Sequence, residues 1–144
     1  MGKTRIIRKE GGGVNRELKS RALARLPKKK INSGVLYVES TFNNTKALFA
    51  DKQGNTIFWS SSGALGFKGA KKGTPFAASK VGELMGEKAK ALGVKDVIII
   101  VKGIGSGRES VIRSFMARGI ELKSIKDNTP IPHNGPKPKK PRRV

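Results

Sequence analysis

The sequence predicts an α/β domain, in which a mixed five-stranded sheet packs against helices. Three observations lead to this class. Residues 35–62 contain three extended segments separated by turn signals, as in an antiparallel meander. From residue 74 to residue 127, helical segments alternate with apolar extended segments, as in a parallel sheet covered by helices. Nearly all large apolar residues fall between residues 34 and 128, so we expect the core there.

The strands of the meander are delimited by short polar turns. Asn43-Asn44 and the segment KQGN at 52–55 are both turn signals. Between and around them the side chains alternate between two faces, which is the period of a half-buried strand. The strands are therefore predicted at 35–42, 45–51 and 56–62.

A helix is predicted to begin after Thr74-Pro75, because threonine is a good N-cap and proline is tolerated in the first turn. Gly93 is its predicted end. Gly82 and Gly86 lower helix stability, so we expect them to permit close approach of a neighbouring backbone. One face of the helix carries the predicted core residues Ala77, Val81, Leu84, Met85 and Leu92.

The remaining elements are a strand, a second helix and a last strand. DVIIIVKG at 96–103 is apolar almost throughout, which is typical of a strand buried on both faces. Ser106 and Glu109 have the S-x-x-E spacing of a capping box, which predicts that the second helix begins there. Its buried side is predicted to contain Val111, Ile112, Phe115 and Met116, and a strand follows at 120–127.

The charge of the chain is the strongest indication of its partner. There are 31 Lys+Arg against 10 Asp+Glu, a formal net charge of +21. This charge favours a polyanion, and nucleic acid fits best. An anionic membrane is a weaker alternative, because no long basic amphipathic helix has an aromatic face and no apolar run approaches the ~20 residues of a span. The absence of cysteine excludes disulfides and Cys-based zinc sites.

The charge and apolar content divide the chain into three parts. Residues 1–33 form a basic N-terminal extension, residues 34–128 the α/β domain, and residues 129–144 a basic, proline-rich C-terminal tail. Both extensions are too poor in apolar residues to offset the entropy of ordering. We expect arms that become ordered on a phosphate backbone, with solvated, disordered ends as the alternative.

Two glycine-rich segments are candidate RNA contacts. KGIGSGRES at 102–110 joins a buried strand to a helix, and backbone N–H groups at such a place bind phosphate; a tight turn that simply needs glycine is an equal alternative. The connection 61–76 is long and contains four glycines, three lysines and Phe67. Lysine, glycine and a stacking aromatic suit RNA, although a solvated loop remains open. Trp59 is expected to pack in the core or on a sheet face.

Catalytic chemistry is weakly indicated. The single histidine, His133, has no carboxylate beside it. A metal nuclease needs clustered carboxylates, and Glu39, Glu83 and Asp96 are the sole trio that falls on adjacent predicted elements. Glu83 is more simply interpreted as part of a solvated helix face. We therefore expect no enzymatic activity and no cofactor or metal.

Five stretches resemble the family of ribosomal protein eleven of the small subunit. They are STFNNT (40–45), DKQGN (51–55), GFKGAKKGTPFAA (66–78), VKGIGSGRES (101–110), and TPIPHNG with the basic end that follows it (129–144). They occur in the family's order and spacing from about residue 34 to residue 144. Most bacterial relatives have G-P-G-P-G in the glycine loop, where this chain has Ile104 and Ser106. Residues 1–33 match less well.

The resemblance implies a three-layer ribonuclease H-like fold without its chemistry. It also implies a cytoplasmic, structural role in the platform of the small ribosomal subunit, where the family bridges helices of the rRNA. Ribosomal proteins seven and eighteen would be neighbours, and the cleft for the mRNA Shine–Dalgarno duplex would lie nearby. A free RNA-binding protein or RNA chaperone outside the ribosome is the alternative, and a nuclease of the same fold is more remote.

The tail, on this interpretation, lies on crossing RNA strands, and its prolines reduce the entropy lost on docking. Asn134-Gly135 is either a simple turn or a site of isoaspartate formation, and the resemblance favours the modification. The predicted RNA-binding residues are Asn43, Asn44, Lys68, Lys71, Lys72, Lys102, Gly103, Gly105, Gly107, Arg108, Arg113, His133, Asn134, Lys137, Lys139, Lys140, Arg142 and Arg143.

Overall fold

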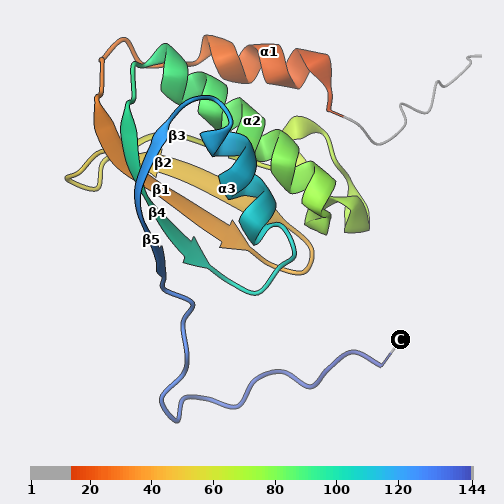
Figure 1. Ribbon diagram of the computed structural model, residues 1–144. Helices are drawn as coiled ribbons and strands as arrows, with labels where there is room; N and C mark the ends of the chain where they lie inside the picture. Colours follow the sequence, from red (N-terminus) through yellow and green to blue (C-terminus); the bar gives the residue numbers. More distant parts are fainter. Residues whose placement is uncertain (1–13, 144) are drawn as a thin grey trace, which may run out of the picture.

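Five strands form one mixed sheet in the order β3-β2-β1-β4-β5, and the computed structural model describes residues 14–143 (Figure 1). β2 is antiparallel to β1 and β3, whereas β4 is parallel to β1 and β5. The predicted α/β class and mixed five-stranded sheet are confirmed. The elements are α1 (Arg16–Ala24), β1 (Ser33–Ser40), β2 (Thr45–Ala50), β3 (Thr56–Ser61), α2 (Pro75–Ala91), β4 (Asp96–Lys102), α3 (Arg108–Met116) and β5 (Glu121–Asp127), with 3-10 turns η1 (Gly63–Leu65) and η2 (Gly69–Gly73).

The two helices of the domain, α2 and α3, lie on the same face of the sheet. The connections β3-α2-β4 and β4-α3-β5 cross the sheet in the same direction, and right-handed crossovers then place α2 and α3 on one side. Of the three layers that the resemblance implies, the described residues form two. The expectation that strand 96–103 is buried on both faces is wrong, because Ile98 and Ile100 are half-buried on the open face while Ile99 is fully buried.

The long helix α2 follows its predicted pattern closely. Thr74 is the N-cap, and its hydroxyl accepts a hydrogen bond from the Ala77 N–H at 3.3 Å. The predicted apolar stripe is buried along its whole length. A Cβ added to Gly82 would lie 2.5 Å from the carbonyl oxygen of Val111, so the absent side chain lets α2 and α3 pack closely. The prediction for these glycines is confirmed.

The start of α3 differs from the prediction. The N-cap is Gly107 and it provides no side-chain cap, so the expected capping box of Ser106 and Glu109 is wrong. The Ser106 hydroxyl instead donates to the carbonyl oxygen of Gly73 at 3.0 Å, a residue from a distant part of the chain. The Ser106 side chain thus makes a tertiary hydrogen bond in place of the predicted cap at the start of α3.

The N-terminal extension contains a helix that packs on the domain. α1 is capped by Asn15, whose side chain accepts from the Glu17 and Leu18 N–H groups. Lys19 forms an ion pair with Glu87 of α2 at 3.2 Å. The expectation that this extension becomes ordered only on RNA is wrong for α1, since its apolar residues and those flanking it contact the core; residues 1–13 of the extension lie outside the described residues. The contacting residues are Val14, Ala22, Leu23, Leu26 and Ile31.

The C-terminal tail leaves the end of β5 as an exposed, extended chain without helix or strand (Figure 1). Along the described residues, no helix has both the length and the apolar character needed to cross a membrane.

Candidate nucleic-acid interface

Three loops meet at the end of the sheet where β1 and β4 terminate. They are the β1–β2 turn (41–44), the segment 68–73 that contains η2, and the glycine loop (103–107), and we call them the loop cluster. The carbonyl oxygen of Phe42 lies 2.1 Å from where Gly73 would carry a Cβ. The Gly105 N–H donates to the carbonyl oxygen of Ser40 at 3.0 Å. Segments far apart in the sequence therefore present one surface.

The glycine loop is packed against the protein itself. A Cβ on Gly103 would lie 2.1 Å from the carbonyl oxygen of Ser40, and one on Gly107 would lie 2.5 Å from the Thr45 hydroxyl. Gly103 also has a φ of 96°, which favours glycine. Its N–H donates to the Thr129 hydroxyl at 3.2 Å. These contacts favour the close-packing alternative for the glycines over an open phosphate cradle.

Arg108 connects the loop cluster to the start of the tail. Its guanidinium donates to the carbonyl oxygen of Gly103 at 2.7 Å and to the carboxylate of Asp127 at 2.6 Å. Asp127 also accepts from the hydroxyl and the N–H of Thr129. The hydrogen bonds from Thr129 and Arg108 hold the pKa of Asp127 well below its usual range. Asp127 is therefore a carboxylate at neutral pH, and it fixes where the tail begins.

The exposed side of the loop cluster is basic and partly apolar. Lys68 and Lys71 are exposed and Lys72 is half-buried. The expectation that Phe67 is available for stacking is wrong: it is 3 % exposed and packs edge-on against Phe76, with ring centroids 6.1 Å apart. The exposed apolar side chains in and beside the loop cluster are instead Phe42, Phe76 and Ile104, which are all more than half exposed and were not predicted as contacts. An apolar residue between two glycines, as at Ile104, was the available signal.

The other predicted residues are more widely spread. Asn43 is exposed in the loop cluster, whereas Asn44 is half-buried and its side-chain oxygen is buried without a hydrogen-bond partner. Lys102 is exposed at the end of β4. Arg113 lies on α3, where it pairs with Glu109 at 3.4 Å, and is not part of the loop cluster. The tail residues His133, Asn134, Lys137, Lys139, Lys140, Arg142 and Arg143 are exposed beyond the domain.

The carboxylates considered for a nuclease are not brought together. In the β1–β4 register, Ser33 is level with Asp96 and Glu39 is level with Lys102, so Glu39 and Asp96 are separated by about 20 Å along parallel strands. Glu83 pairs with Lys80 at 3.3 Å. Across residues 14–143, no group of three or more His, Asp or Glu side chains is arranged to hold a metal ion.

A model of the family described as Ribosomal protein S11 matches residues 34–143. The match includes all five strands apart from Ser33, the first residue of β1, together with the loop cluster and nearly the whole tail, whereas α1 lies outside it. Proteins of this family are structural components of the small ribosomal subunit that bind rRNA. Because the match covers most of the chain, the protein belongs to the ribosomal protein S11 family.

Proposed function

We propose that this protein joins separate helices of the small-subunit rRNA in the platform, with the loop cluster on one RNA segment and the tail on another. The observation that carries this proposal is the anchoring of the tail at the loop cluster. Arg108 donates hydrogen bonds both to Gly103 in the glycine loop and to Asp127 at the end of β5. The tail therefore begins next to the loop cluster, and the two basic surfaces are adjacent at this point. A protein with this geometry can fix the relative position of two RNA segments.

The charge of the tail suits this role. Residues 129–143 contain five Lys or Arg and no acid, and all the cations are exposed. Each phosphate that they neutralise releases condensed counterions. Five prolines restrict the chain before binding, so less conformational entropy is lost when it docks. The basic tail then screens the repulsion between RNA strands that lie close together.

The finer placement rests on the family resemblance. It supports a position in the cytoplasmic small subunit beside ribosomal proteins seven and eighteen, at the cleft that receives the Shine–Dalgarno duplex. The contacts we assign to rRNA are the predicted side chains of the loop cluster and the tail; the glycines of the glycine loop are left out, because they pack against the protein itself. Protein–RNA cross-links on assembled subunits test this placement nucleotide by nucleotide.

Replacement of the cluster lysines tests the RNA contact directly. In the variant with Lys68, Lys71 and Lys72 changed to Ala, we expect weaker rRNA binding and a smaller salt dependence, because fewer phosphates are neutralised. The matched control changes Lys52, Lys90 and Lys95 to Ala; these lysines are exposed, and they lie near the opposite end of the sheet.

If the two triple variants bind rRNA with equal affinity and equal salt dependence, the loop cluster is not part of the RNA interface. Co-sedimentation with small subunits in cell extracts separates this proposal from a free RNA chaperone, which would remain outside the subunit fraction.

A further inference from the structure

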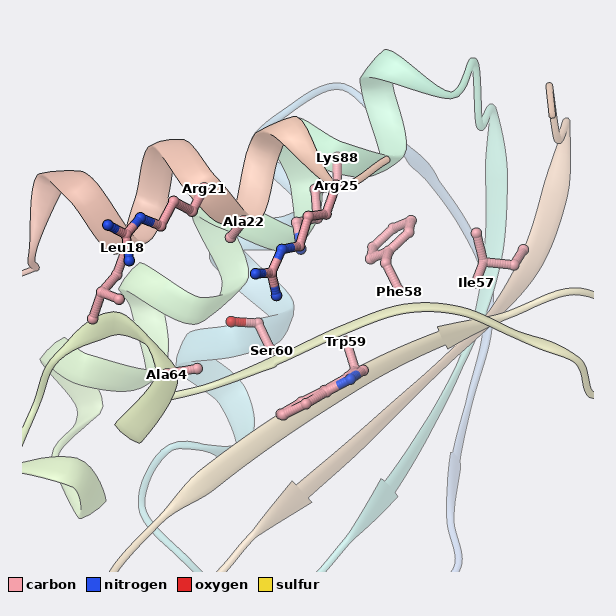
Figure 2. Close-up of a pocket in the computed structure, with 10 residues that line it drawn as sticks. All are labelled: Leu18, Arg21, Ala22, Arg25, Ile57, Phe58, Trp59, Ser60, Ala64 and Lys88. Atoms are coloured by element: carbon pink, nitrogen blue, oxygen red, sulfur yellow. The ribbon is translucent and has the colours of Figure 1, made fainter. Parts of the chain in front are cut away.

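A second basic hollow lies between α1 and the edge strand β3, and we call it the α1/β3 groove. It has a volume of about 410 Å³ and shares no residue with the loop cluster. Of the ten residues that line it, Arg21, Arg25 and Lys88 are cations and none is an acid. Figure 2 shows the Arg25 side chain extending from α1 towards β3, above Ser60. The positive charge of the lining therefore favours the binding of an anion in the groove.

Lys88 is the unusual member of this lining. The residue is 4 % exposed, and its ammonium group lies 5.6 Å from the centroid of the Phe58 ring. It has no ion pair or hydrogen bond within residues 14–143, and burial lowers the pKa of its ammonium group. A cation that is largely withdrawn from water and has no counter-charge lowers the free energy of unfolding. An anion in the groove would supply that counter-charge.

Trp59 stands where the groove meets a second hollow on the open face of the sheet. Figure 2 shows Phe58 and Ser60 projecting from β3 towards the helices and Trp59 projecting to the other side. Trp59 is 60 % exposed and lines both hollows. The second hollow adds Tyr37, Lys46 and Lys102. An exposed aromatic ring beside cations is the arrangement on which unpaired bases stack.

We propose that a single RNA strand crosses the free edge of β3, with a phosphate in the α1/β3 groove and a neighbouring base stacked on Trp59. β3 ends the sheet, so within the described chain no other strand covers this edge. α1 lies outside the family match, so the groove joins this chain's own N-terminal helix to the family domain. The proposal deepens the rRNA-binding role on which it rests, because it assigns RNA to a surface away from the loop cluster.

RNA is favoured over an acidic protein segment as the occupant. Both partners supply negative charge, but RNA brings a flat base next to every phosphate, whereas an acidic segment brings a ring only where its sequence contains an aromatic residue. The net charge of +21 likewise favours a polyanion of regular charge spacing. The two hollows together contain five cations and one acid, Glu39, so the path across β3 is basic on both sides.

The fluorescence of Trp59 tests the proposal, because it is the single tryptophan of the chain. The full-length protein is titrated with a single-stranded oligoadenylate, and we expect saturable quenching. Lys88→Met should weaken the quenching affinity about tenfold, which corresponds to loss of one charged contact. The same variant should unfold at an equal or higher temperature, because a buried charge is removed; a merely structural lysine would give a lower temperature.

The control is Lys90→Met, which removes an exposed charge from the same helix outside the groove and should leave the affinity almost unchanged. RNA binding without a change in Trp59 fluorescence overturns the proposal, as does equal affinity of the Lys88 and Lys90 variants. Equal competition by a polyglutamate peptide assigns the groove to an acidic protein instead and also overturns it.

Failure of this inference is distinguishable from failure of the proposed function. Co-sedimentation with small subunits that persists without any oligoadenylate quenching rejects the groove alone. Retained quenching in the variant lacking Lys68, Lys71 and Lys72 shows that the groove acts independently of the loop cluster.

Discussion

At the residue scale, a small hydrogen-bonded network decides where the tail begins. Asp127 accepts from Thr129 and from Arg108, and Thr129 accepts in turn from the Gly103 N–H. These residues are separated by up to 26 positions in the sequence. Through Arg108 and Thr129, the Asp127 carboxylate therefore connects the last strand to the glycine loop and to the tail.

Replacement of Asp127 by Asn should loosen this junction. The lowered pKa means that the carboxylate stabilises the folded state at pH above 3.8 and that this stabilisation is lost only as pH falls through the lower folded value. In the wild-type protein, protection of the Thr129 amide should therefore persist below pH 3.8. In Asp127→Asn, amide exchange at Gly103 and Thr129 should be faster at neutral pH, with β1 unchanged. Unaltered exchange at both amides would show that the network does not hold the tail.

Asn134 is placed where its side chain can rearrange to isoaspartate. It has a φ of 58°, in the left-handed region, and it is followed by Gly135 in the exposed tail. Glycine leaves the next N–H accessible for attack on the Asn side chain, and no helix or strand restrains it. We expect isoaspartate in protein from mature subunits, detected by peptide mass spectrometry as deamidation with fragments typical of the β-linkage. An intact Asn134 in aged ribosomes contradicts the expectation.

At the element scale, α2 and α3 depend on close contact between their backbones. Gly82 faces the carbonyl oxygen of Val111, and Gly86 faces Arg118 and Phe115. Each glycine lowers intrinsic helix stability by about 1 kcal/mol relative to alanine. The glycines therefore lower local helix stability while allowing α2 and α3 to pack closely.

Gly82→Ala should destabilise the protein although alanine is the better helix former. The new methyl group would lie 2.5 Å from the backbone oxygen of Val111, and overpacking of this kind costs about 1–3 kcal/mol. A lower midpoint of urea unfolding measures the effect. Gly63→Ala is the control, because its nearest neighbour would be at 3.7 Å. An increase in stability for Gly82→Ala would show that the helices separate without loss.

At the scale of the whole molecule, the positive charge is distributed over several surfaces. The loop cluster, the tail and the α1/β3 groove each present cations, whereas Glu87 is occupied by Lys19 and Arg118 in the packing of the helices. With 31 basic residues against 10 acidic ones, the internal ion pairs leave a large excess for a partner.

Binding of the whole protein to rRNA should therefore weaken steeply with salt. We expect the logarithm of the affinity to fall with the logarithm of the salt concentration by about 0.7 to 0.9 for each phosphate neutralised. Filter binding across a salt series measures the slope. An affinity that is constant between low and moderate salt would contradict a mainly electrostatic interface.

The strands, α2 and the position of the core follow from the sequence. Alternation with a period of two, turn residues such as Asn43-Asn44, and the Thr74 cap are local signals, and each produced an element within a few residues of its predicted bounds. The basic composition likewise indicates a nucleic-acid partner, in agreement with the family match.

Other features required the tertiary structure. The strand order, with both crossovers running the same way, placed the helices on one face and left Trp59 exposed. The burial of Phe67, the diversion of Ser106 to Gly73 and the docking of α1 arise from contacts between distant segments. Local periodicity determined which residues form an element, but which side chains remain free for RNA depends on where those elements meet, because burial is a property of the packed chain.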